Sequence, residues 1–155
     1  MEEEILIRTI TANDIHDITR LRCAMFESMG YGDPEQLAAV ALACQSYFAR
    51  AIPAGQYHGW LAFTAAGVAV ASGGVVVDEH PPGPVSQSGR IGYIMNLYTD
   101  PAFRRRGLAR QLFARIMDWI RAEGILVAAL HATAMGREVY AQFGFADSNE
   151  MRARI

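Results

Sequence analysis

The hydrophobic and polar positions of the chain divide its first third into one strand and two helices. Residues 5–10 alternate in the way typical of a half-buried strand. Capping residues at 11–14 then precede apolar positions at helical spacing, and this helix should end near Gly30. A second helix is predicted to begin at Asp33-Pro34, a capping residue followed by proline at the first helical position, and to end at residues 53–55.

The period then changes to that of strands. Residues 60–65 and 68–77 are short apolar runs separated by Ala66-Gly67, which predicts a hairpin. Within the second run, Ser72-Gly73-Gly74 indicates a bulge or a close approach of another segment to the backbone. The Pro/Gly/Ser-rich loop at residues 78–89 has two open interpretations, a surface excursion or one edge of a substrate pocket.

The most informative pattern lies between residues 91 and 120. An apolar strand over residues 91–98 should stop at Thr99-Asp100-Pro101, because proline cannot donate a hydrogen bond to a sheet. Three arginines lead to Gly107, and an amphipathic helix begins directly after it. Its apolar face is formed by Leu108, Leu112, Ile116, Trp119 and Ile120.

The last quarter completes the expected architecture. Gly124 should end the helix, and the continuous apolar run at residues 125–130 predicts an interior strand. A short helix from about Met135 to Phe143 follows, and residues 145–155 can supply a last strand. This order predicts an α/β, or α+β, three-layer fold, and we expect residues 1–155 to form a single domain.

The strand, basic turn and helix around Gly107 predict a phosphate site. Amides of a first helical turn have no partner within the helix, and the helix dipole adds partial positive charge there. Glycine lets a ligand oxygen approach the backbone closely. The sequence contains neither the phosphate-binding loop of nucleotide hydrolases nor the G-x-G-x-x-G of dinucleotide sites, so the ligand should be a different phosphate compound.

The residues RRRGLA at 104–109 match the pattern R/Q-x-x-G-x-G/A. This segment resembles the coenzyme A-binding motif of the GNAT acyltransferases (GCN5-related N-acetyltransferases). A second segment, EVYAQFGF at 138–145, is similar to the family's "lYeklGF" segment, and with the element order the resemblance spans nearly the whole chain. It implies a mixed, mostly antiparallel sheet flanked by helices, and an acetyl-CoA-dependent N-acetyltransferase acting on a small-molecule or peptide amine by direct attack on the thioester.

The resemblance also suggests how acetyl-CoA would be held. Exposed backbone groups of the interrupted strand could pair with the amide-rich pantetheine, and the N–H of Leu97 or Tyr98 could polarise the thioester carbonyl. The pyrophosphate would lie on the amides of residues 105–110, and Thr133 stands where the family often has asparagine. The expected cofactor-binding residues are Leu97, Tyr98, Thr99, Arg104, Arg105, Arg106, Gly107, Leu108, Ala109, Arg110 and Thr133.

Tyr140 is the expected catalytic general acid. The ordinary pKa of a phenol, about 10, suits protonation of a departing thiolate, and the resemblance points to the same residue. Three sources of the general base stay open, namely Glu79, His131 and water. The acceptor site should be lined by residues 25–32 and 78–89, and the four histidines are scattered singly, so no metal is expected.

Composition narrows the alternatives. All 14 basic residues are arginine, which excludes covalent chemistry on a lysine amine, and the net charge of −2 argues against a nucleic-acid-binding arginine patch. Cys23 and Cys44 should be buried free thiols in helices. The acidic start is unlike a signal peptide and no apolar run is long enough to span a bilayer, so we expect a cytoplasmic protein without membrane partners. A non-catalytic CoA-binding regulatory or interaction module is the alternative function, and homodimerisation is left open.

Overall fold

The structure is a computed structural model that describes residues 3–134 and 136–155. These residues form strands and helices in the order β1 (Ile5–Thr9), α1 (Ile15–Ser28), α2 (Pro34–Ala51), β2 (Tyr57–Thr64), β3 (Ala69–Glu79), β4 (Arg90–Thr99), α3 (Leu108–Ala122), β5 (Val127–Leu130) and α4 (Arg137–Gln142). Short 3-10 segments precede α1, at Ala12–Asp14, and follow β4, at Pro101–Phe103.

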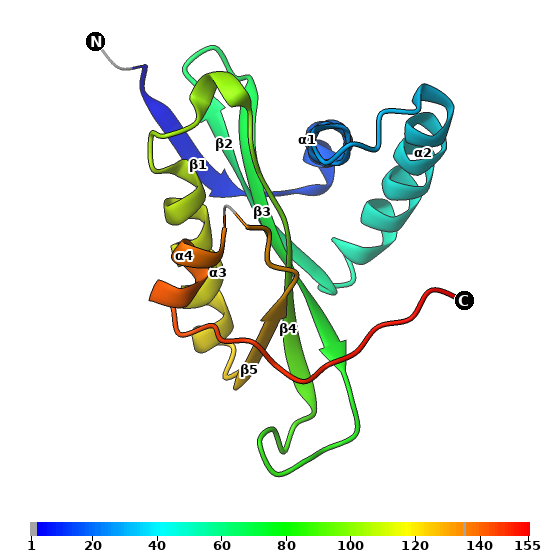
Figure 1. Ribbon diagram of the computed structural model, residues 1–155. Helices are drawn as coiled ribbons and strands as arrows, with labels where there is room; N and C mark the ends of the chain where they lie inside the picture. Colours follow the sequence, from blue (N-terminus) through cyan, green and yellow to red (C-terminus); the bar gives the residue numbers. More distant parts are fainter. Residues whose placement is uncertain (1–2, 135) are drawn as a thin grey trace.

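The strands form one sheet in the order β1-β2-β3-β4-β5. The first four are antiparallel neighbours, and β5 runs parallel to β4. Helices α1 and α2 cover one face of the sheet, whereas α3 and α4 cover the other (Figure 1). The prediction of a mixed, mostly antiparallel sheet flanked by helices is therefore confirmed.

Each face of the sheet has its own apolar core. Leu112, Phe113 and Ile116 of α3 are completely buried against one face, which confirms the amphipathic pattern predicted for this helix. Ile18 and Leu21 of α1 are buried against the opposite face, which α1 and α2 cover. Burial of a large apolar side chain stabilises a fold by about 1.5–3 kcal/mol, so these two layers hold the sheet between them.

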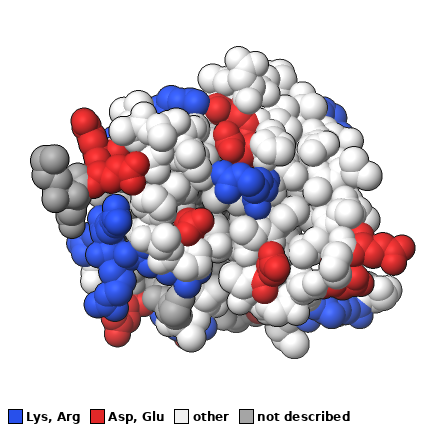
Figure 2. Space-filling model, turned by 90° about the horizontal axis from the view of Figure 1, so that it is seen from above, with Lys and Arg blue, Asp and Glu red and all other residues white. Residues whose placement is uncertain are grey.

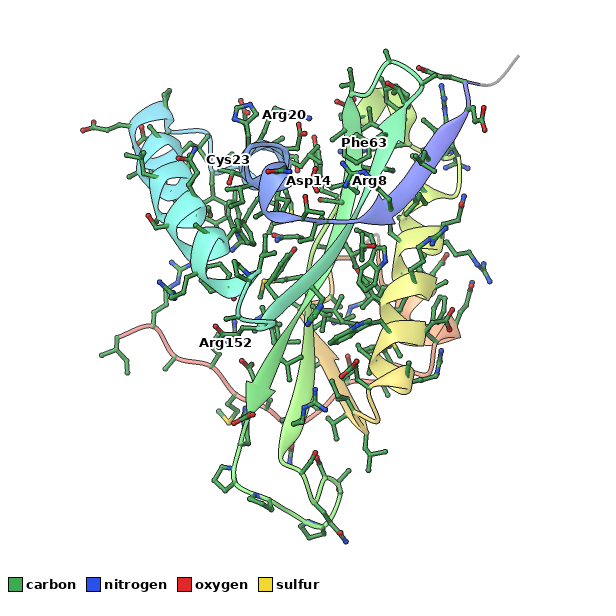
Figure 3. All side chains as sticks on the ribbon, turned by 180° about the vertical axis from the view of Figure 1, so that it is seen from behind. Arg8, Asp14, Arg20, Cys23, Phe63 and Arg152 are labelled. Atoms are coloured by element: carbon green, nitrogen blue, oxygen red, sulfur yellow. The ribbon has the colours of Figure 1, made fainter. Side chains whose placement is uncertain are left out.

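An ion pair fixes the start of α1 to β1. Asp14 is buried, and its carboxylate accepts two hydrogen bonds of 2.9 Å from the Arg8 guanidinium and one of 2.7 Å from the Thr11 N–H. The guanidinium also lies over the Phe63 ring, as the labelled side chains show (Figure 3). The hydrogen bond from Arg8 lowers the pKa of the Asp14 carboxyl below its ordinary value.

The end of the chain differs from the prediction. Residues 145–155 form no strand, and they run past the sheet toward the side of α2 (Figure 1). In the sequence ADSNEMRARI, the apolar side chains larger than alanine are those of Met151 and Ile155, and both are exposed. Such a segment has no alternating apolar face to bury, which explains why no strand forms.

Because that strand is missing, β5 lies at the edge of the described sheet and its residues are half-buried, so the prediction of an interior strand is wrong. The hairpin of β2 and β3 is confirmed, but β3 continues to Glu79, and the expected loop begins only at His80. The start expected for the short helix, Met135, lies outside the described residues. Cys23 and Cys44 are in helices and are free thiols, as predicted, but both are half-buried rather than buried.

Candidate functional site

An irregularity in the centre of β4 is the first feature of the site. Gly73 of β3 stands opposite two residues of β4, Asn96 and Leu97, so the extra residue belongs to β4. Asn96 is buried and has a φ of +60°, in the left-handed region that asparagine tolerates better than most residues. A Cβ on Gly73 would lie 3.0 Å from the Leu97 side chain. The predicted bulge and close approach are thus confirmed, with the bulge on the partner strand.

Three hydrogen bonds hold Asn96 in this conformation. Its side-chain N–H donates to the Tyr57 hydroxyl at 2.8 Å, its side-chain oxygen accepts from Arg22 at 2.5 Å, and its carbonyl accepts from the Ser72 hydroxyl at 2.7 Å. Complete burial raises the pKa of Tyr57 to about 12, so its hydroxyl stays protonated. Sequence reasoning gave no role to Arg22 or Tyr57, although one polar residue inside the apolar run YIMNLYT was a usable signal that Asn96 needs hydrogen-bond partners.

The last five residues of β4 lie at an open edge of the sheet. Pairing of β4 with β5 ends where Ile94 faces Leu130, and no other described strand continues it. Residues 95–99 therefore have β3 on one side and no strand on the other within the described chain. Backbone groups along such an edge can bind an extended, amide-containing ligand as an added strand.

The alternation of backbone directions decides which groups point to that edge. Successive residues of a strand direct their N–H and C=O groups to alternate sides. The N–H of Asp100 donates to Val70 on β3, so the backbone groups of Asp100 and Tyr98 point toward β3. Those of Thr99 and Leu97 therefore point away from β3, to the open edge. The Thr99 carbonyl accepts a 3.1 Å hydrogen bond from the Arg104 side chain. The geometry therefore favours Leu97 over Tyr98 as the N–H donor at the open edge.

The turn after β4 leads directly into a cluster of unpaired amides. The Asp100 side chain accepts from the Ala102 N–H at 3.0 Å, which closes the turn, and Gly107 with a φ of +74° precedes α3. The first main-chain hydrogen bond of α3 joins the Gln111 N–H to the Gly107 carbonyl at 3.0 Å. The N–H groups of residues 105–110 have no acceptor among the described residues. This is the arrangement that binds phosphate at a helix N-terminus.

Tyr140 lines a cavity of about 550 Å³ between β5, α4 and the chain end. Its ring packs against Phe113 and Phe145, and burial raises the pKa of its phenol. His131 lines the same cavity but is exposed. The Thr133 hydroxyl accepts from the Gly136 N–H at 3.2 Å at the turn before α4, so this hydroxyl has a local partner and keeps its O–H as a donor.

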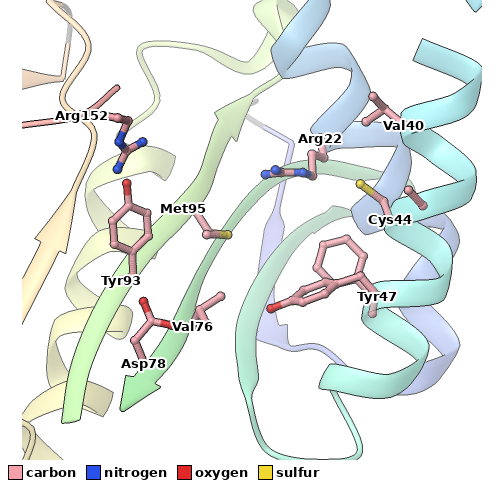
Figure 4. Close-up of a pocket in the computed structure, with 11 residues that line it drawn as sticks. Arg22, Val40, Cys44, Tyr47, Val76, Asp78, Tyr93, Met95 and Arg152 are labelled. Carbon is pink, nitrogen blue, oxygen red and sulfur yellow. The ribbon is translucent and has the colours of Figure 1, made fainter. Parts of the chain in front are cut away.

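A second cavity, of about 630 Å³, lies between α1, α2 and the face of β3 and β4 (Figure 4). Arg22, Cys44, Asp78 and Met95 are among the side chains that line it. Of the segments expected to line an acceptor site, residues 25–32 and 78–89, this cavity includes Asp78 alone among its described lining residues. Glu79 is exposed and lines neither cavity, so the structure does not bring it together with Tyr140.

Comparison with known proteins identifies the family to which this chain belongs. Residues 16–145 match the sequence model described as the acetyltransferase (GNAT) family. The chain belongs to the GNAT family. No curated protein matches the sequence.

Solved structures of GNAT proteins have the same fold. A GCN5-related N-acetyltransferase from Ralstonia eutropha JMP134 is 34% identical, with a TM-score of 0.88 over 98% of this chain and 99% of that one. A predicted acetyltransferase from Clostridium acetobutylicum, solved with acetyl-CoA, is 24% identical, with a TM-score of 0.89 over 98% of this chain and 96% of that one. Glucosamine-6-phosphate N-acetyltransferase from Arabidopsis thaliana is 17% identical, with a TM-score of 0.65 over 99% of both chains.

Two kinds of feature are absent from residues 3–134 and 136–155 of this GNAT chain. None of their helices has the length and apolar character to cross a membrane. These residues also contain no group of three or more side chains placed to hold a metal ion.

Arginines form separate groups among acidic residues on the face seen from above, rather than a continuous basic surface (Figure 2).

Proposed function

We propose that this GNAT protein transfers an acetyl group from acetyl-CoA to a primary amine of a small molecule or peptide, by direct attack of the amine on the thioester. The observation that carries the proposal is the continuity of two binding surfaces. Arg104 bridges the open edge of β4, at Thr99, to the unpaired amides of residues 105–110. One surface suits an extended amide-containing chain and the other suits a phosphate group, and coenzyme A contains both.

The residues present fit that ligand. Around Gly107 a Cβ would meet no atom nearer than the Gln111 side chain, at 3.8 Å, so the space over the amides is open to a pyrophosphate. The arginines of residues 104–106 and Arg110 are exposed and could add charge-assisted hydrogen bonds. Leu97 and Thr99 would pair with the pantetheine amides along the open edge.

Bound acetyl-CoA supplies an acetyl group that is activated as a thioester. Leu97 would donate its N–H to the carbonyl oxygen of that group and so stabilise the negative charge that develops during attack. Removal of one such donor typically costs about 10²–10³-fold in rate. The hydrogen bonds to Asn96 hold the bulge that sets the position of the Leu97 N–H.

Tyr140 would then donate its proton to the departing sulfur. A phenol of ordinary pKa, about 10, is protonated at neutral pH, and burial raises the pKa of Tyr140 further. No described side chain or backbone group accepts a hydrogen bond from its hydroxyl. A positioned general acid contributes about 10²–10⁴-fold to rate. Glu79 and His131 are both exposed, and neither lines the larger of the two cavities, that of about 630 Å³ between α1, α2, β3 and β4. This favours loss of the amine proton to water.

A panel of primary amines incubated with acetyl-CoA, with free thiol and acetylated product both measured, tests this function. We expect at least one amine to release thiol and acquire an acetyl group in equal amounts. A rise in Tm with acetyl-CoA, together with no release of CoA thiol in the presence of any amine, would instead favour the non-catalytic CoA-binding module.

A further inference from the structure

We propose that the larger cavity binds the acceptor as an α-amino acid with an apolar side chain, and that Arg22 binds its carboxylate. This inference rests on the proposed acetyl transfer and adds the substrate class. It follows from the way Arg22 is held, from its place beside the bulge of β4, and from the character of the remaining walls.

Arg22 is fixed in place but has no carboxylate partner within residues 3–134 and 136–155. One of its terminal nitrogens donates to Asn96, and the guanidinium lies over the Phe26 ring with 4.6 Å between its carbon and the ring centre. Among the described residues, no aspartate or glutamate lies within ion-pair distance of it, whereas Arg8 and Arg20 each have such a partner. Its charged end points into the cavity (Figure 4). A planar guanidinium with a free edge is well suited to a carboxylate.

The position of Arg22 fixes where that carboxylate would lie. Because the guanidinium is hydrogen-bonded to Asn96, a bound anion lies next to Leu97, the residue proposed to hold the thioester carbonyl. In an α-amino acid one carbon separates the carboxylate from the amine, so both groups fit at this end of the cavity. The positive charge of Arg22 would also disfavour the ammonium form of the amine and favour the neutral nucleophile.

The rest of the cavity accommodates an apolar side chain. Its walls include Phe48, Val76 and Met95. The one carboxylate among its described lining residues, Asp78, comes four residues after Gly74 on β3, which is about 13 Å along the strand. Arg152 also lines the cavity, so its described walls carry two arginines and one aspartate, and a purely cationic amine is disfavoured. The volume of about 630 Å³ is typical of a small-molecule site.

The test compares L-amino acids with their carboxamides, which lack the negative charge and keep the side chain. The rise in Tm with acetyl-CoA is measured first, because its absence would contradict the proposed function rather than the substrate class. Thiol release is then followed for each amino acid and carboxamide, with L-phenylalanine and L-phenylalaninamide as the reference pair. The variants are Arg22→Gln and, as a matched control on the opposite face of the sheet, Arg121→Gln.

We expect kcat/KM to be about 10–100-fold higher for the accepted amino acid than for its carboxamide, as is typical of one charged hydrogen-bonding contact. Arg22→Gln should lower the value for the amino acid about 10–100-fold more than the value for the carboxamide, so that the preference disappears, and Arg121→Gln should behave as the wild type. An equal loss for both compounds in Arg22→Gln would show a structural role through Asn96 and overturn the proposal. Acetylation of other amines but of no amino acid would overturn it too.

Discussion

Replacement of Gly107 by valine separates the cost of backbone strain from the loss of a binding surface. Gly107 has a φ of +74°, in the left-handed region, where a side chain with a Cβ costs about 1–2 kcal/mol. A Cβ would meet no atom nearer than 3.8 Å, so no clash is added. For a chain of this length, 1 kcal/mol corresponds to about 2–4 °C in Tm, and Gly107→Val should therefore unfold about 2–8 °C below the wild type.

The effect on acetyl-CoA should be far larger than the effect on stability. The valine side chain would stand among the unpaired amides of residues 105–110 and keep a pyrophosphate from them. Each hydrogen bond to a charged group contributes about 1.5–3 kcal/mol. Loss of two such bonds raises the Kd by about 10²–10⁴-fold, since each 1.4 kcal/mol is a factor of ten.

Gly124→Val is the matched control. Gly124 follows the other end of α3 and has a φ of +67°, and a Cβ added to it would meet no atom within 4 Å. Both variants should lose similar stability in thermal unfolding, but calorimetric titration with CoA should show weak binding for Gly107→Val alone. If Gly107→Val binds CoA with wild-type affinity, the phosphate site lies elsewhere and the account of the α3 N-terminus is refuted.

Three further predictions concern single residues. Tyr140→Phe should leave CoA affinity nearly intact and lower kcat by about 10²–10⁴-fold; wild-type kcat would give the tyrosine a structural role instead. Asn96→Ala should lower the free energy of unfolding in urea by about 2–4 kcal/mol, because it strains the bulge and leaves the buried Tyr57 hydroxyl unpaired; an unchanged midpoint would contradict this. Asp14→Asn should cost about 1.5–3 kcal/mol at neutral pH.

The pH dependence of the Asp14 variant follows from the lowered pKa of that carboxyl. Folding lowers this pKa below the unfolded value of about 3.9, so the stabilisation is complete above that pH and is lost as the pH falls through the folded pKa. The difference in unfolding free energy between wild type and Asp14→Asn should therefore be constant near neutrality and shrink in acid. A difference that does not change down to strongly acidic pH would show that the ion pair with Arg8 is not its source.

The features that could be predicted from the sequence are those that depend on residues close together in the chain. Pro101 ends a strand, Gly107 precedes a helix, and the apolar face of α3 is readable from its spacing. Each of these depends on neighbours within a few residues. The unpaired amides of the proposed phosphate site were predictable for the same reason, because they are consecutive in the chain.

The rest depends on contacts between distant segments. The bulge was sought at the glycines of β3 because glycine marks it in sequence, whereas the extra residue is Asn96 on β4. Arg22 lies 74 positions before Asn96 in the chain, and no local pattern pairs them. The chain end was predicted as a last strand that completes the order of elements, but its side chains offer no apolar face to pair.

The central claim, direct transfer of acetyl from acetyl-CoA to an amine, is tested most directly with the protein in excess over acetyl-CoA. Thiol release and the mass of the intact protein are measured first without and then with an accepted amine. The account predicts no thiol and an unmodified protein without the amine, and then one thiol and one acetylated amine for each acetyl-CoA. Thiol release without the amine, together with an acetyl group on the protein, would contradict it.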